Sequence, residues 1–142
     1  MKLYLGGAPG FKPGDLIEPH PSKHVDGCAW CASGADDSHA PDRVFGTTFR
    51  LYAKFYASKY VRGWLYIVEP EGELEPSTAD PFECYSAPAM RVVKVSERAV
   101  ELNPSERRHL WKEWRADDLR TGRMGPNFLQ DRMIKRMLGI PL

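Results

Sequence analysis

WLYIV, residues 64–68, is the stretch that most directly indicates the fold, because five large apolar residues follow one another. Most of them are aromatic or β-branched, a composition typical of a buried strand. Gly63 precedes this run and Pro70 and Gly72 follow it, so strand-breaking residues bound it on both sides. The sequence therefore predicts a central strand here that ends by Pro70.

Further strands are expected on both sides of this run, at residues 2–5, 43–47 and 90–95, the last continuing toward 100–102. The glycines after residue 5 are expected to end the first strand. A helix is expected after Thr48, which is placed to cap it; its apolar positions recur at helical spacing, namely Leu51, Tyr52, Phe55 and Tyr56. Residues 11–19 and 72–87 are expected to form loops, the first with a tight turn at Pro13 and Gly14.

Two helices are expected at the C-terminal end. Asn103 as cap, Pro104 in the first turn and Glu106 three residues after the cap together predict a helix start, and that helix fades near Gly122. The second helix begins at about Pro126. Strands that interleave irregularly with one early and two late helices favour an α+β chain. We expect residues 1–102 to form the main domain and residues 103–142 a helical arm.

Composition is ordinary for a globular protein of 142 residues, with 42% hydrophobic and 27% charged residues. No apolar run approaches the roughly 20 residues that span a bilayer, and no basic segment precedes an apolar block at the N-terminus. A cytoplasmic protein without membrane contact is therefore expected. The net charge of +1 gives no overall attraction to nucleic acid, and aromatic and basic residues do not interleave, so no nucleic-acid partner is expected.

A cluster of histidines and cysteines lies in the polar segment 20–42, which lacks any hydrophobic period. Its members are His20, His24, Cys28 and Cys31, with His39 as a further candidate. Zinc prefers four nitrogen or sulfur ligands, and the C-x-x-C spacing supplies two thiolates from one tight turn. A zinc-stapled loop with a structural role is one reading; a reversible disulfide and an ordinary loop with two free thiols are the alternatives.

Three segments together resemble the small rifampin ADP-ribosyltransferases and their bacterial and phage relatives. They are LYLGG at 3–7 followed by KPGDLIEP at 12–19, RVFGTTFRLYAKFYAS at 43–58, and GWLYIVEPEGELEP at 63–76. Their order and spacing agree with that family over roughly the first hundred residues. The resemblance implies an ADP-ribosyltransferase-like split β-sheet, NAD as cofactor, and a dinucleotide wall built from Tyr4, Leu5, Gly6, Gly7, Phe45 and Thr47.

The resemblance also implies a chemistry. Enzymes of this family cleave the bond between nicotinamide and ribose through an oxocarbenium-like transition state, as glycosidases do at a sugar. Their histidine hydrogen-bonds a ribose hydroxyl, their tyrosine stacks beside the nicotinamide, and an acidic residue steadies the developing cation. Glycines let the backbone come close to the dinucleotide.

This sequence departs from the family at each of those positions. Leu5 stands at the histidine position and Phe45 at the tyrosine position. The acidic position falls near Ser77, with Glu75 and Asp80 as the neighbouring carboxylates. The expectation is therefore a divergent relative that binds NAD with weak or lost transferase activity, in which Glu75 or Asp80 takes the acidic role.

The C-terminal segment FLQDRMIKRMLGIPL, residues 128–142, is Met-rich, amphipathic and basic. Such stripes occur at partner-binding sites, although a helix packed over the domain's own sheet is the simpler alternative. A non-catalytic interaction protein, phage- or host-directed, with a zinc-stapled loop and this arm as its contact surfaces, is thus the rival to the transferase reading.

Overall fold

The computed structural model describes residues 1–19, 43–77, 82–121 and 128–141. The chain divides into two compact units, Met1–Glu101 and Leu102–Leu142. Among the described residues, the first unit contains seven strands and one helix, and the second contains two helices. The prediction of an α+β chain is confirmed.

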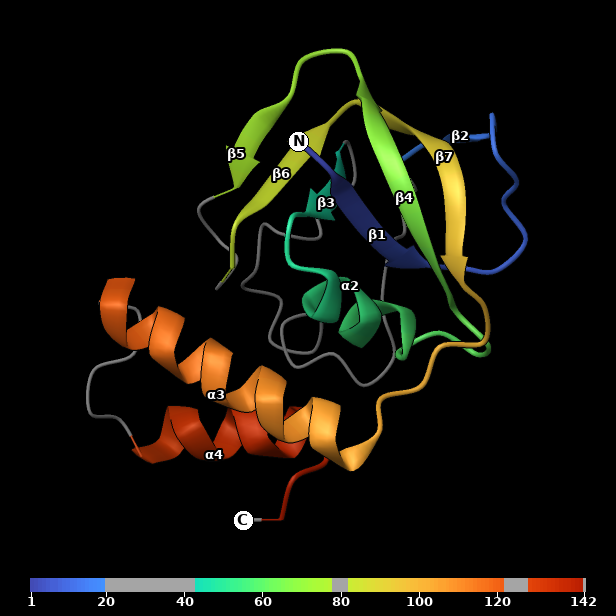
Figure 1. Cartoon of the computed structure of the whole chain (residues 1–142). Coiled ribbons are helices and arrows are strands. Elements are labelled where there is room, and N and C mark those ends of the chain that lie inside the picture. The colour runs from blue at the N-terminus through green and yellow to red at the C-terminus, as the bar shows by residue number, and fades with distance from the viewer. Residues whose placement is uncertain (20–42, 78–81, 122–127, 142) are drawn as a thin grey trace. The chain divides into compact units, whose positions relative to one another are not determined.

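A seven-stranded antiparallel sheet forms the first unit, in the order β2-β7-β4-β1-β3-β6-β5 (Figure 1). Its strands are β1 (Leu3–Gly7), β2 (Leu16–Ile17), β3 (Val44–Thr47), β4 (Trp64–Glu71), β5 (Glu75–Ser77), β6 (Cys84–Ala87) and β7 (Ala89–Glu97). The apolar run that begins at Trp64 is indeed an interior strand, paired with β7 on one side and β1 on the other. It continues through Pro70, which lies opposite Met90, so Pro70 does not end the strand as expected; the strand ends at Glu71, directly before Gly72.

The sheet has a seam between β1 and β3. Five register pairs join β1 to β4, from Leu3↔Val68 to Gly7↔Trp64, whereas a single pair, Tyr4↔Thr47, joins β1 to β3. Beyond that pair, no further register pair joins the C-terminal half of β1 to the N-terminal half of β3, and we call this stretch without register pairs the parting of β1 and β3. The strands therefore fall into two groups, β2-β7-β4-β1 and β3-β6-β5, with the parting flanked by Leu5 on β1 and Phe45 on β3.

Helix α2 (Arg50–Ala57) packs against β1 through small residues. A Cβ atom added at Gly6 would overlap the carbonyl oxygen of Ala53 and would lie 2.6 Å from the backbone nitrogen of Ala57. Lys54 of the same helix is buried and forms an ion pair with Glu97 of β7 at 3.5 Å. Glycine at position 6 is thus required because the helix approaches the strand at backbone distance.

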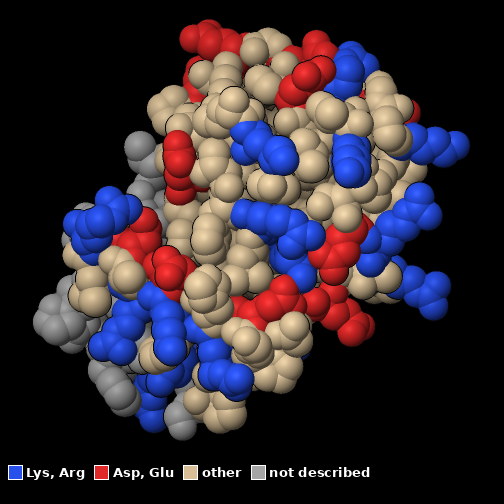
Figure 2. Space-filling model, viewed as in Figure 1, with Lys and Arg blue, Asp and Glu red and all other residues tan. Residues whose placement is uncertain are grey.

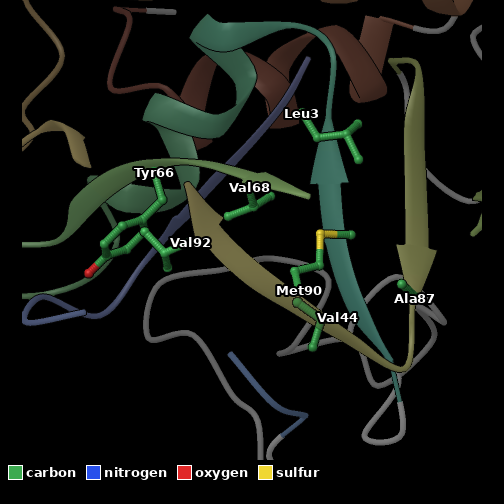
Figure 3. Packing of buried hydrophobic residues seen from close by; sticks show 7 residues of the cluster. All are labelled: Leu3, Val44, Tyr66, Val68, Ala87, Met90 and Val92. Carbon is green, nitrogen blue, oxygen red and sulfur yellow. The ribbon is translucent and has the colours of Figure 1, made fainter. Parts of the chain in front are cut away.

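The main core lies on the other face of the sheet, where side chains from five strands meet (Figure 3). The cluster consists of Leu3, Val44, Tyr66, Val68, Ala87, Met90 and Val92. Met90 also occupies the space beside Gly46, since a Cβ atom there would be 3.3 Å from the Met90 sulfur. Contact between β7 and β3, which are not neighbours in the strand order, requires the sheet to curve around this cluster.

Four expectations about local structure are wrong. Residues 72–87 are not a continuous loop, because β5 and β6 lie within them. Gly6 and Gly7 belong to β1 instead of ending it, and residues 100–102 do not extend the last strand. The tight turn at Pro13 and Gly14 is confirmed, but residues 11–19 are not entirely loop, because the two-residue strand β2 follows the turn. Two backbone hydrogen bonds attach this segment to β7: Gly14 N donates to Val92 O, and Val92 N donates to Asp15 O.

The predicted cap of α2 is also wrong, since Phe49 occupies the N-cap position and makes no side-chain cap bond. Thr47 organises this turn instead, because its hydroxyl donates to Glu83 O at 2.8 Å and accepts from Phe49 N at 3.1 Å. Thr48 donates its hydroxyl to the Glu83 carboxylate at 2.9 Å. Both threonines therefore tie the start of the helix to the residue that precedes β6.

The second unit holds α3 (Pro104–Thr121) and α4 (Phe128–Met137). The predicted start of α3 is confirmed in detail: Glu106 N donates to Asn103 Oδ1 at 2.7 Å, and Asn103 N donates to Glu106 Oε1 at 3.1 Å. Leu110 and Trp114 of α3 and Ile134 of α4 are buried. None of the helices in the described ranges combines the length and apolar character needed to cross a membrane.

Replacing Asn103 by alanine removes one bond of this reciprocal pair and leaves the Glu106 amide without its side-chain acceptor. We expect the free energy of unfolding to fall by about 1 kcal/mol. Urea titration followed by far-ultraviolet circular dichroism measures the change. Ser105→Ala, at an exposed site in the same turn, is the matched control and should stay within about 0.5 kcal/mol of the parent protein. Equal stability of the two variants would contradict a role for the cap.

Candidate functional site around the parting of β1 and β3

The residues expected at the dinucleotide site lie on two different faces of the sheet. Residues directly opposite each other in antiparallel strands share a face. Tyr4 is opposite Thr47, and Thr47 is opposite Cys84, so these three form one row on the face that α2 also covers. Leu5, the next residue of β1, points to the opposite face and packs at the margin of the main core. Gly7 shares the face of Leu5 by strand alternation.

A second row on the α2 side of the sheet brings Phe45 and Glu75 onto a common face. Phe45 is opposite Ser86, and Ser86 is opposite Glu75. Strand spacing places Phe45 and Glu75 roughly 10 Å apart. Two residues to which the resemblance gives roles are therefore neighbours on one face, but Leu5 is not on that face.

Glu75 is held by Arg43, the residue just before β3. The guanidinium donates to the Ser86 carbonyl at 2.8 Å and to the Ser86 hydroxyl at 3.1 Å, and it lies 3.6 Å from the Glu75 carboxylate. The Glu75 side chain is 58% exposed. An exposed ion pair of this kind contributes little free energy. Its main effect is to fasten the edge strand β5 to β3.

Aromatic rings surround Leu5 on its own face. Phe11, Trp64 and Tyr66 belong to the same cluster as Leu5, with Tyr66 directly opposite it. The Tyr66 hydroxyl donates to Ala8 O at 2.5 Å and accepts from Phe11 N at 3.3 Å, which fixes the loop after β1. Burial is the main cause that raises the pKa of Tyr66, so its hydroxyl stays protonated and serves as donor. The half-buried Leu5 side chain thus lies in an ordered, largely apolar setting.

The two adjacent glycines of β1, Gly6 and Gly7, differ in what surrounds them. Gly6 faces α2 at backbone distance, so helix packing accounts for it. Gly7 meets only the Cδ2 atom of Leu5 at 3.4 Å. Thr47 is buried, and its hydroxyl already donates and accepts one hydrogen bond within the β3–α2 turn. Of the residues expected to contact a dinucleotide, Gly6 and Thr47 are therefore accounted for by packing and turn structure.

Glu83 is the acidic residue that sequence reasoning missed. One carboxylate oxygen accepts the Tyr85 hydroxyl at 2.6 Å, and the other accepts the Thr48 hydroxyl at 2.9 Å. Tyr85 is on the same face of the sheet as Leu5. Each oxygen keeps a second lone pair, because an ionised carboxylate accepts about four hydrogen bonds. The carboxylate is thus fixed in place and still able to meet a ligand.

The hydrogen bonds to Glu83 set its charge state. The Tyr85 hydroxyl first, and the Thr48 hydroxyl second, lower the pKa of Glu83 from its ordinary 4.5. The same bond raises the pKa of Tyr85 above its ordinary value of 10.0, mainly because the carboxylate accepts the phenolic proton. At neutral pH the pair is therefore a carboxylate and a neutral phenol.

One sequence pattern could have predicted β6, namely the alternation of side chains along Glu83-Cys84-Tyr85-Ser86. In the structure Cys84 and Ser86 are buried on one face of the strand, and Tyr85 is on the other. A strand there places Glu83 at its start. Asp80 and the cluster His20, His24, Cys28 and Cys31 lie outside the described residues. Within the described ranges, no group of three or more His, Cys, Asp or Glu side chains is arranged to hold a metal ion.

No protein-family model matches this chain, and no curated protein compared with it does either.

Proposed function

We propose that this chain is a divergent ADP-ribosyltransferase-like protein that binds NAD at the parting of β1 and β3 and has weak transferase or glycohydrolase activity. The proposal starts from the resemblance of residues 3–76 to the rifampin ADP-ribosyltransferases. One structural observation supports it most. β1 and β3 share a single register pair, and the stretch without further pairs is flanked by Leu5 and Phe45, two residues of the dinucleotide wall that the resemblance implies.

Glu83 is our candidate for the acidic role among the described residues. The group that steadies an oxocarbenium-like cation must be ionised and held in place. The hydroxyls of Tyr85 and Thr48 supply both properties to Glu83. Glu75 fits this role less well because its carboxylate already faces the guanidinium of Arg43 at 3.6 Å. Asp80, two residues before Phe82, remains a candidate from the sequence.

Weak activity follows from the two substituted positions. Leu5 offers no hydrogen bond to a ribose hydroxyl, a loss that typically costs about 1–3 kcal/mol. Phe45 keeps a ring for stacking but has no hydroxyl. Together these changes lower both affinity and rate relative to a protein with a histidine and a tyrosine there.

Calorimetric titration with NAD, followed by measurement of nicotinamide release, tests the proposal. We expect binding in the high-micromolar to millimolar range and slow release of nicotinamide. NADH, whose dihydronicotinamide carries no positive charge and is a poor leaving group, should bind without release. Absence of any heat at millimolar NAD would refute the proposal.

Leu5→His is the substitution that restores the family's histidine. We expect NAD to bind about tenfold more tightly, because one hydrogen bond to a ligand contributes about 1–1.5 kcal/mol. Leu5→Met, which keeps the apolar packing beside Trp64 and Tyr66, is the matched control and should bind NAD as the parent protein does. If the histidine and methionine variants bind NAD with equal affinity, the ribose does not lie beside residue 5.

The second candidate function is a non-catalytic interaction protein that uses the helical unit as its contact surface. The unit's excess of Lys and Arg favours it, with nine such residues against five Asp and Glu. The apolar stripe of α4 is a poor candidate for that contact, because Ile134 and Leu138 are buried within the protein itself. A partner that still binds after the exposed cations of this unit are neutralised would exclude this surface.

A further inference from the structure

The net charge of +1 conceals two units of opposite sign. Met1–Glu101 contains eleven Lys and Arg against fourteen Asp and Glu, whereas Leu102–Leu142 contains nine against five. Charges attract a partner over about one Debye length, roughly 8 Å at physiological salt. A partner therefore responds to the charge of the surface it meets and not to the total. The expectation that excluded nucleic acid rested on this total and on the lack of interleaved aromatic and basic residues; residues 108–115, where Trp111 lies between Arg108 and Lys112, depart from the second ground.

Three exposed cations follow one face of α3. Arg108, Lys112 and Arg115 are at positions i, i+4 and i+7, which places them along a single stripe of the helix. We name these three residues the basic stripe. At 1.5 Å per residue it extends about 10 Å along the axis. Figure 2 shows Lys and Arg side chains gathered over the helices of this unit.

Acidic side chains do not neutralise the basic stripe. Glu106 accepts from the Asn103 amide, Asp117 forms an ion pair with Arg120, and Asp118 is buried. Glu113 is exposed, but it is one residue from Lys112 and two from Arg115, spacings at which helical side chains do not face each other. Among the residues that the structure describes, no salt bridge connects the stripe to a carboxylate. Its positive charge is therefore available to a partner.

Trp111 orders one cation of the stripe and one cation beside it. The Arg115 guanidinium lies 5.8 Å from the centroid of the Trp111 ring, and the Lys135 ammonium of α4 lies 4.7 Å from it. Cation–π contacts of this kind restrict long, flexible side chains. Ordering them before binding lowers the entropy that binding would otherwise cost. Lys135 thereby adds a fourth cation beside the stripe.

We infer that the basic stripe binds the phosphate backbone of a nucleic acid. Arginine forks and lysine ammonium groups are the usual phosphate ligands. A protein partner would be expected to meet aromatic or aliphatic anchors, since interface cores are depleted in Lys. The aromatic ring on this face, Trp111, is half-buried and is in contact with Arg115 and Lys135, and the exposed apolar side chain farther along the same line, Leu119, is four residues beyond Arg115. A membrane surface fits less well, because Leu110 and Trp114, on the apolar face of α3, are buried.

Fluorescence anisotropy with a labelled 20-nucleotide oligothymidylate tests the inference on the full chain. We expect micromolar binding at 50 mM salt that weakens with added salt. The variant Arg108→Gln/Lys112→Gln/Arg115→Gln should bind at least tenfold more weakly. The slope of log K against log salt should become shallower by about 2, because each phosphate contact to a single strand contributes about 0.7.

The matched control removes the same charge from the other unit. Lys2→Gln/Lys12→Gln/Lys94→Gln changes three exposed lysines and should bind the oligonucleotide within twofold of the parent protein. Circular dichroism establishes that both variants are folded, and Arg108→Lys/Arg115→Lys, which keeps the charge, should retain most of the affinity. A control as weak as the stripe variant, no binding at 50 mM salt, or equal binding of a 20-residue polyglutamate peptide would each overturn the inference. NAD binding is measured separately and has no bearing on this outcome.

Discussion

Replacing Gly6 by alanine is expected to lower the free energy of unfolding by about 3 kcal/mol or more. The added methyl group would overlap the carbonyl oxygen of Ala53 and lie 2.6 Å from the nitrogen of Ala57. Overpacking of a buried site ordinarily costs about 1–3 kcal/mol, when flexible side chains yield. Here the obstructing atoms belong to the helix backbone, so the whole of α2 must move away from β1. We expect the cost at or above the upper end of that range.

The adjacent glycine provides the control. A Cβ atom at Gly7 would have the Leu5 Cδ2 atom at 3.4 Å as its nearest neighbour, an ordinary contact. Gly7→Ala should therefore change the free energy of unfolding by less than about 1 kcal/mol. Urea denaturation followed by tryptophan fluorescence measures both variants. A Gly6→Ala protein as stable as the Gly7→Ala protein would show that α2 does not approach β1 as closely as the structure has it.

Replacing Glu83 by glutamine is expected to lower the rate of nicotinamide release by about 10²–10³, the usual effect of removing one electrostatic stabiliser of a transition state. Glutamine keeps the shape and still accepts hydrogen bonds, but it carries no charge to oppose the forming cation. Because that charge develops only in the transition state, NAD affinity should change by less than about threefold. The measurement is best made in the Leu5→His background, where we expect higher turnover.

Glu75→Gln is the matched control for this charge. Arg43 keeps its bonds to Ser86 when Glu75 loses its charge, so the variant should remain folded with its rate within about threefold of the parent protein. Asp80→Asn completes the set. A rate lost in the Glu75 or Asp80 variant but kept in the Glu83 variant would assign the acidic role to that other residue.

The lowered pKa of Glu83 predicts the acid side of the pH profile. The carboxylate stays ionised until the pH falls below its ordinary value of 4.5, so nicotinamide release attributable to it should be constant from neutral pH down to about that value. The same direction governs stability. The stability that the lowered pKa of Glu83 contributes is fully present above pH 4.5, the ordinary pKa of the carboxyl group, and it is lost as the pH falls through the lower pKa of the folded protein.

The parts of the fold that the sequence predicted are those with strong local signals. The apolar run from Trp64 to Val68, the β3 strand and the capping pair Asn103–Glu106 were each read correctly because neighbouring residues alone determine them. The strands β5 and β6 were missed because both are short, and β5 also carries Glu75 and Pro76. Pairing of β6 with β3, pairing of β5 with β6 and the Arg43 bonds to Ser86 stabilise them, and none of these is visible in a local window.

In the candidate site, too, local sequence predicts some features and contacts between distant segments determine the others. Strand alternation determines that Leu5 and Tyr4 face opposite sides, but which side carries the core depends on where α2 packs. What distinguishes Glu83 from other carboxylates is that Tyr85 and Thr48, from two different segments, both donate to it, and no local stretch of sequence shows this. Paired glycines looked like a ligand wall in the sequence, whereas Gly6 is accounted for by contact with a helix that follows more than forty residues later.

The contact between β1 and α2 also limits how the protein can change. A harmful substitution in most cores can be relieved by a smaller side chain across the interface. At Gly6 the opposing atoms are the carbonyl of Ala53 and the amide of Ala57, which every amino acid possesses. Gly63 is constrained in the same way, because a Cβ atom there would overlap the carbonyl oxygen of Ala57. A genetic screen for second-site suppressors of Gly6→Ala should therefore recover reversion to glycine, and no side-chain replacement at 53 or 57.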